Sequence, residues 1–216
     1  MKTQEIIKQV LNDKFPDNNL NSIYGDFSIR FELGGNLKNG TKERVDRALM
    51  RATEIYNQTI GNEDILVVIE EYPNDFYDQD GKNKKHFYTL IDNSKLDRYK
   101  GPFEQVYFET DVDGNEKECV LDEKLECDLL IGRFKSNEIN SIEIIRGIAN
   151  LEMGFEPCIP QDVTFFTPKT TNGFRIYDDR GCDIWSTDRE NLRPIYNKLN
   201  DWILDYNRQD IDLIFK

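Results

Sequence analysis

The chain has 216 residues, of which 41 are acidic and 28 basic, giving a formal net charge of −13 at pH 7. No apolar run approaches the roughly 18 residues of a membrane span, and the first 30 residues hold no hydrophobic signal-peptide core. The large basic footprint of a nucleic-acid-binding protein is also missing. We therefore expect a cytoplasmic protein that binds neither a membrane nor nucleic acid directly.

Cysteine and histidine content restricts the chemistry further. Cys119, Cys127, Cys158 and Cys182 include no C-x-x-C pair, so we expect free thiols rather than disulfides or a zinc site. His86 is the only histidine, which excludes every site that needs two. We expect no cofactor and no metal.

The first third of the chain alternates helical and extended patterns. Residues 3–15 carry one apolar helical stripe, and 27–33 alternate as a half-buried strand does. A helix is predicted over 41–58, with Arg44 among the side chains that solvate its outer face. The continuous apolar run 65–69 indicates a central strand buried on both faces. The predicted inner face of the helix is Val45, Leu49, Ala52, Ile55 and Tyr56.

The middle of the chain reads as loops and short strands. Residues 72–86 are rich in turn formers and predict an exposed loop, while 87–91 indicate a short strand. Residues 105–108 and 119–121 flank Asp-Val-Asp-Gly-Asn, a strong hairpin signal. Residues 129–134 form another strand candidate.

The last third combines a hairpin with two helices. A helix is predicted from Ser136 to about Gly154, followed by a strand over 163–166. Residues 173–177 and 182–185 pair across a second turn. A capping box at Thr187 begins a final helix whose inward side chains continue to Ile203.

These elements favour an α+β fold, with a mainly antiparallel sheet and three to four helices packed against it. No linker or internal repeat divides the chain. We expect one domain over residues 1–216, with the acidic hairpin of about 103–128 as a candidate insertion.

This acidic hairpin is the most unusual electrostatic feature. Residues 109–128 hold nine acids and two lysines, a balance of −7. A turn at 113–114 places Asp111 opposite Glu116 and Glu109 opposite Glu118; a turn at 114–115 pairs Asp111 with Glu118. Either register sets like charges directly across the ladder, which destabilises the hairpin by up to about 1 kcal/mol for each pair.

Three interpretations of the acidic hairpin are open. Its acids can form a solvated tip, a docking surface for a basic partner, or a cation site. The spacing only partly resembles a calcium loop, because Gly114 occupies its fourth position and Asp122 its twelfth. The docking surface gives the partner-binding candidates Glu109, Asp111, Asp113, Glu116, Glu118 and Asp122.

The second hairpin carries another group of candidates, namely Asp178, Asp179, Arg180 and Asp183. Adjacent carboxylates beside an arginine can bind a metal or form an acid/base pair. Asp is also preferred in turns for purely local reasons, and turn chemistry is the favoured interpretation.

Three segments together resemble a known family: RFELG at 30–34, IYDDRGCD at 176–183 and WILDYNR at 202–208. They are similar to uncharacterised proteins, mostly of Bacillus-type bacteria, grouped as the domain of unknown function number three thousand eight hundred and eighty-five. The resemblance extends from about residue 15 to the end, and residues 72–128 depart most from the pattern. It implies a cytosolic bacterial protein but no known activity and no functional residues.

The sequence therefore favours a non-enzymatic acidic binding or inhibitor protein. Its expected partner is a basic protein, for example a toxin neutralised by its immunity protein, or a nucleic-acid-binding factor whose site it occupies. The alternative is a metal-dependent hydrolase that uses Asp178, Asp179 and Asp183, with Arg180 as an anion clamp.

Overall fold

The protein is described by a computed structural model, in which residues 25–73, 81–102, 106–110, 116–120 and 126–216 are placed. The strands are β1 Phe27–Glu32, β2 Asp64–Glu71, β3 Leu96–Lys100, β4 Val106–Thr110, β5 Glu116–Val120, β6 Asp128–Lys135, β7 Asp162–Thr167, β8 Asn172–Ile176 and β9 Gly181–Ser186. The α-helices are α2 Lys42–Thr59, α3 Lys82–Phe87, α4 Ser141–Leu151, α5 Arg189–Lys198 and α6 Asp205–Phe215.

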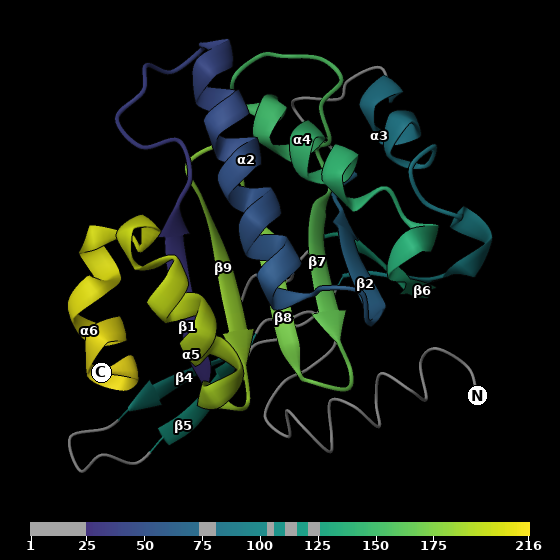
Figure 1. The fold of residues 1–216 in the computed structure, drawn as a ribbon. Coiled ribbons are helices and arrows are strands. Elements are labelled where there is room, and N and C mark those ends of the chain that lie inside the picture. Colours follow the sequence, from purple (N-terminus) through teal and green to yellow (C-terminus); the bar gives the residue numbers. More distant parts are fainter. Residues whose placement is uncertain (1–24, 74–80, 103–105, 111–115, 121–125) are drawn as a thin grey trace.

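A seven-stranded sheet organises the described residues (Figure 1). Its order is β1-β9-β8-β7-β2-β6-β3, and all neighbouring strands are antiparallel. β4 and β5 form a separate two-stranded sheet. The predicted α+β class and antiparallel sheet are confirmed, with five α-helices among the described residues rather than three to four.

Alternation of side chains along the strands builds the core on the face that the helices cover. In β1, Ile29 and Phe31 are buried while Arg30 between them is exposed, as the sequence predicts. The run 65–69 is buried throughout and lies in an interior strand, which confirms the predicted central strand.

The helices lie side by side over this face. α2 and α4 cross the middle of the sheet, and α5 and α6 lie toward the β1 edge (Figure 1). Tyr56 of α2 packs edge-on against Phe165 and Phe174, with ring centroids 5.2 and 5.4 Å away. The predicted inner face of α2 is confirmed, although Leu49 is only half-buried.

Two predicted helices have different bounds in the structure. The helix expected from Ser136 begins at Ser141, because residues 136–138 form a separate 3-10 turn. The C-terminal helix is not continuous: α5 ends at Lys198, and α6 begins at Asp205. Ile203 forms a β-bridge with Phe31, and this pairing takes the backbone between α5 and α6 out of helical geometry.

The middle of the chain contains the remaining differences. Phe87 ends α3, so the short strand expected over 87–91 is wrong, as is the loop assignment for 82–86. The backbone N–H groups of Thr89 and Leu90 bond back to residues 86 and 87, which makes turns and no ladder. Strand β3 was not predicted, since Leu-Asp-Arg-Tyr-Lys at an exposed sheet edge lacks apolar alternation. The helix expected over 3–15 lies outside the described residues.

A close packing contact between β8 and β9 gives a test of the packing on the opposite face of the sheet, to which Trp185 points because Ile184 faces the helices. A Cβ added at Gly173 would lie 2.0 Å from the indole ring of Trp185, which is fully buried. We expect Gly173→Ala to lower the free energy of unfolding by about 1–3 kcal/mol, because the indole has no free space to move into. The exposed β1 substitution Ser28→Ala is the control and should change the free energy by less than about 0.5 kcal/mol. Urea titrations of both variants make the comparison, and equal values would contradict it.

Candidate functional site

The acidic hairpin has a register different from both predictions. Glu109 pairs with Lys117, Phe108 with Glu118, and Thr110 with Glu116. The ladder between β4 and β5 therefore contains no acid directly opposite an acid. Both predicted like-charge registers are wrong, and the argument that such pairs mark a functional site no longer applies to this hairpin.

The hairpin's partner-binding candidates are only partly covered by the structure. Glu109 lies in β4, and Glu116 and Glu118 lie in β5, where the backbone pairing alone is described. Asp111, Asp113 and Asp122 lie outside the described residues. The part that these six acids play in partner binding stays a prediction.

The second group of candidates lies in the turn between β8 and β9 and in β9 itself, where Asp178, Asp179 and Asp183 bind three different arginines. Asp183 forms a two-point pair with Arg30, at 2.8 Å from Nε and 3.1 Å from Nη2. Asp178 accepts from Nε of Arg180 at 2.8 Å and from its backbone N–H at 2.6 Å. Turn geometry and ion pairing thus account for both side chains.

The third carboxylate, Asp179, is completely buried and pairs with Arg44. Arg44 was expected on the solvated face of its helix, but only 7% of it is exposed. Its Nη1 donates to the carbonyls of Gly35 and Leu37 at 2.8 Å each. A Cβ at Gly34 would clash with the guanidinium, so the lack of a side chain at Gly34 makes room for this arginine. The pair joins α2 to the β8–β9 turn.

Carboxylates also pair with arginines at the end of β2. Here acids do lie directly opposite acids on the neighbouring strands. Glu70 lies opposite Asp162, and Glu71 lies opposite Asp128. Arg175 bridges the first pair, at 3.8 Å from Glu70 and 2.8 Å from Asp162.

Arg98 of β3 bridges the second pair, at 3.2 Å from Glu71 and 2.7 Å from Asp128. Consecutive residues of β2 point to opposite faces of the sheet, so one arginine is needed on each face. No sequence pattern indicates this arrangement, because it depends on strand order and register.

Glu71 is also the centre of a hydrogen-bonded network beside a small cavity of about 130 Å³. The Tyr88 hydroxyl donates to Glu71 at 2.6 Å, and Gln161 donates to it at 3.3 Å. Burial, and then the hydrogen bond to Glu71, raise the pKa of Tyr88. Burial raises the pKa of the nearby Cys127 thiol to about 11, so this thiol stays protonated at neutral pH and is a poor nucleophile. The hydrogen bonds of Glu71 thus stabilise the local structure, and the neighbouring Cys127 thiol is not activated as a nucleophile.

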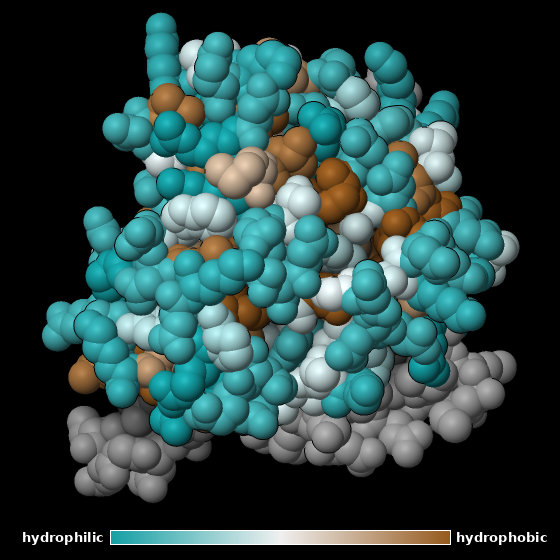
Figure 2. Space-filling model, viewed as in Figure 1, coloured by the Kyte–Doolittle hydropathy of each residue, from teal (hydrophilic) through white to brown (hydrophobic). Residues whose placement is uncertain are grey.

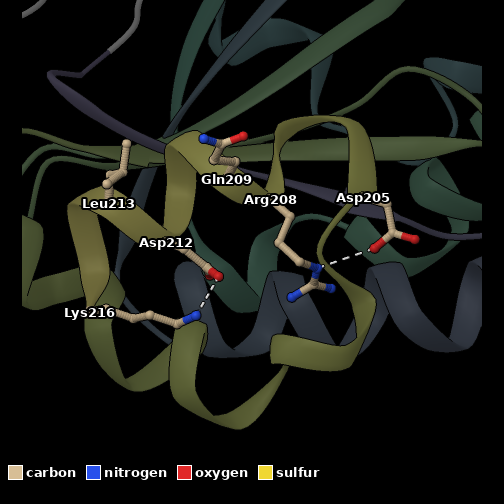
Figure 3. Close-up of a pocket in the computed structure, with 6 residues that line it drawn as sticks. All are labelled: Asp205, Arg208, Gln209, Asp212, Leu213 and Lys216. Atoms are coloured by element: carbon tan, nitrogen blue, oxygen red, sulfur yellow. Dashed lines mark hydrogen bonds and ion pairs between the residues drawn. The ribbon is translucent and has the colours of Figure 1, made fainter.

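A hollow of about 660 Å³ lies along α6. In Figure 3, Arg208 is turned toward Asp205 and Lys216 toward Asp212, with contacts of 3.2 and 2.6 Å. Its charged groups are therefore engaged with one another. Asp205 and Arg208 form an i,i+3 pair on α6. The described residues that line it are Asp205, Arg208, Gln209, Asp212, Leu213 and Lys216.

Beside this hollow, α6 exposes two large hydrophobic side chains. Tyr206 is 89% exposed and Leu213 is 80% exposed, and they are seven residues apart on one helical face. Figure 2 shows hydrophobic atoms among hydrophilic ones where α6 lies in Figure 1. The sequence analysis did not identify this pair. Tyr206 and Leu213 are seven residues apart and therefore share a face of α6, different from the face of the buried Ile211 and Phe215.

The described residues contain neither a metal-binding cluster nor a helix that could span a membrane. Within the described residues, no three His, Cys, Asp or Glu side chains are placed to hold a metal ion. Nor does any helix described there have the length and apolar character needed to cross a bilayer.

Comparison with known proteins gives a family without an assigned activity. Residues 7–207 match the family described as "Domain of unknown function (DUF3885)". The chain belongs to this family. The uncharacterised protein YnaE of Bacillus subtilis (strain 168) is 40% identical over 48 residues, which is 22% of this chain and 18% of that protein. The match thus covers less than a fifth of the relative's length. No solved structure matches.

The buried pair of Arg44 and Asp179 gives a stability test. Arg44→Met leaves the Asp179 carboxylate buried without its counter-charge, so we expect the free energy of unfolding to fall by about 3–5 kcal/mol. Lys42→Met, which removes an exposed i,i+4 pair with Asp46 on the same helix, should cost less than about 1 kcal/mol. Guanidinium titrations of both variants measure the difference. A loss in Arg44→Met as small as that of the control would contradict a structural role for the pair.

Glu70 gives a pH test. Burial raises the pKa of Glu70 above its ordinary 4.5, against the opposing effect of Arg175. The folded state then holds this proton more tightly than the unfolded state, so the stability contributed by Glu70 is present below about pH 4.5 and is lost as pH rises through the folded pKa. We expect the free energy of unfolding of Glu70→Gln, relative to the wild type, to increase as pH rises from 4.5 toward neutrality. Urea titrations at several pH values test this, and a difference that falls with pH would contradict the sign.

Proposed function

We propose that this protein is a non-enzymatic acidic binding protein that engages a basic partner protein, in the manner of an immunity protein or of an inhibitor of a nucleic-acid-binding factor. The charge distribution supports this. Five arginines are committed to eight carboxylates in and around the sheet: Arg30, Arg44, Arg98, Arg175 and Arg180 with Glu70, Glu71, Asp128, Glu152, Asp162, Asp178, Asp179 and Asp183.

The proposal rests on the negative charge that remains when these paired arginines and acids are left out. Removing these five arginines and eight acids from the 28 bases and 41 acids of the chain leaves 23 bases and 33 acids, a balance of −10. The internal pairs therefore offset little of the negative charge. An excess of this size attracts a basic protein over about a Debye length and accelerates its encounter.

The alternative hydrolase is less well supported by the same contacts. A metal or an acid/base pair would need carboxylates that converge on an open position. Asp178, Asp179 and Asp183 instead bind three separate guanidinium groups. The described contacts therefore leave none of these three carboxylates available for catalysis, whereas acids elsewhere in the chain stay available to bind a basic partner.

A salt-dependent capture experiment tests the proposal. We expect the immobilised protein to retain, at low salt, a strongly basic protein from a lysate of the organism that encodes it. The complex should dissociate at about 0.5 M salt, where the Debye length is roughly 4 Å. Retention of no basic protein at low salt would refute the proposed function.

Association kinetics with that purified partner then test the acidic hairpin. Lysine at Glu109, Asp111, Glu116 and Glu118 should slow association at least tenfold, because steering depends on local charge. The control places lysine at four acids outside the hairpin, the exposed Asp26, Glu43, Asp97 and Glu156, with the same change in net charge. Equal slowing in both variants would show that net charge alone matters and that the hairpin is not the docking surface.

A further inference from the structure

The outward face of α6 combines exposure, apolar character and negative charge. Tyr206, Gln209 and Leu213 lie at i, i+3 and i+7, so they share one face over about 10.5 Å of helix axis. The Asp205 side chain is 96% exposed on one flank, and Asp210 is exposed on the other. A large exposed aromatic and an aliphatic residue on one face are the kind of side chains that anchor protein interfaces.

This face is presented by a rigidly held helix. Ile211 and Phe215 are buried beneath it, and the Phe215 ring stacks on Tyr196 with centroids 5.2 Å apart. The Tyr196 hydroxyl donates to Asp212 at 2.7 Å. Little order remains to be imposed on α6 when a partner binds, which lowers the entropic cost of docking.

The cations of α6 are engaged by neighbouring groups of the chain. Arg208 donates to the carbonyls of Asn200 and Ile203 at 3.1 and 3.0 Å, and to the Asn200 side chain at 3.0 Å. Lys216 pairs with Asp212. Asp210 forms no ion pair with any described residue. Among the described residues, Asp210 is therefore the acid of this face that no cation offsets, and it lies beside the apolar centre.

We infer that the outward face of α6, centred on Tyr206 and Leu213, docks a basic segment of the partner protein that carries apolar side chains between its lysines or arginines. This inference rests on the proposed function and names the surface and the chemistry of its partner. The positive charge of such a segment complements the acids beside Tyr206 and Leu213, which favours it over other binding partners. A second copy of the chain would bring another −13 of charge against the same acids, and an anionic lipid surface would repel them too.

Two synthetic peptides test the inference. One, of about 18 residues or five helical turns, places leucines on one helical face and lysines on the other. The second keeps every lysine and replaces each leucine with serine. Binding of both labelled peptides is measured by fluorescence anisotropy at low salt to the wild type, to the double variant Tyr206→Ser/Leu213→Ser, and to Met50→Ser. Met50, which is 53% exposed on α2, is the matched control for removal of an exposed hydrophobic side chain.

We expect the wild type and Met50→Ser to bind the lysine–leucine peptide at least tenfold more tightly than the lysine–serine peptide. The double variant should lose that preference while keeping its affinity for the lysine–serine peptide, with unchanged circular dichroism and Tm. Unchanged preference in the double variant, or equal loss in Met50→Ser, would overturn the α6 surface and leave the proposed function standing. Failure of both peptides to bind would refute the proposed function itself. Dimerisation of the wild type that the double substitution abolishes, measured by light scattering, would assign the face to a second copy and overturn the inference.

Discussion

The structure depends on the neutralisation of carboxylates that the sheet withdraws from water. An ionised carboxylate in a low-dielectric environment is costly unless an opposite charge and hydrogen bonds compensate it. Here arginine is the partner each time, since its planar guanidinium can hold one carboxylate at two points or bridge two. Arg175 and Arg98 each bridge a pair of acids that β2 places directly opposite its neighbours. Without them, the end of the central strand would repel both adjacent strands.

The same constraint separates structural acids from those available to a partner. Asp178, Asp179 and Asp183 were candidates because acids clustered beside an arginine look like a reactive site. In the fold they fasten the β8–β9 turn to itself, to α2 and to β1. A carboxylate that already has a guanidinium gains little from a further cation. In the proposed binding, the partner therefore meets acids without such a guanidinium, and on α6 the exposed Asp210 lies beside the exposed Tyr206 and Leu213.

Periodicity predicted most strands and helices, because side chains that alternate or recur every three to four residues decide burial locally. It could not predict register. The acidic hairpin was assigned a two-residue turn, whereas five residues, 111–115, separate the paired positions Thr110 and Glu116. It also could not place Arg44 inside, since only the distant Asp179 makes burial of that side chain favourable. The break between α5 and α6 has the same origin, because it depends on a bridge from Ile203 to β1.

Charge and apolar contact act at different stages of the binding proposed here. Electrostatic attraction extends over about a Debye length and governs how often partners meet, while apolar anchors act only in contact and govern how long a complex lasts. Residues 109–128, which include the acidic hairpin, carry −7 of the chain's net charge of −13. In the described pairing of β4 with β5, no acid lies directly opposite another acid. The α6 face has fewer charges and two exposed anchors. A partner that is basic but has no apolar side chains would be attracted without being retained, so specificity would have to come from contact with Tyr206 and Leu213.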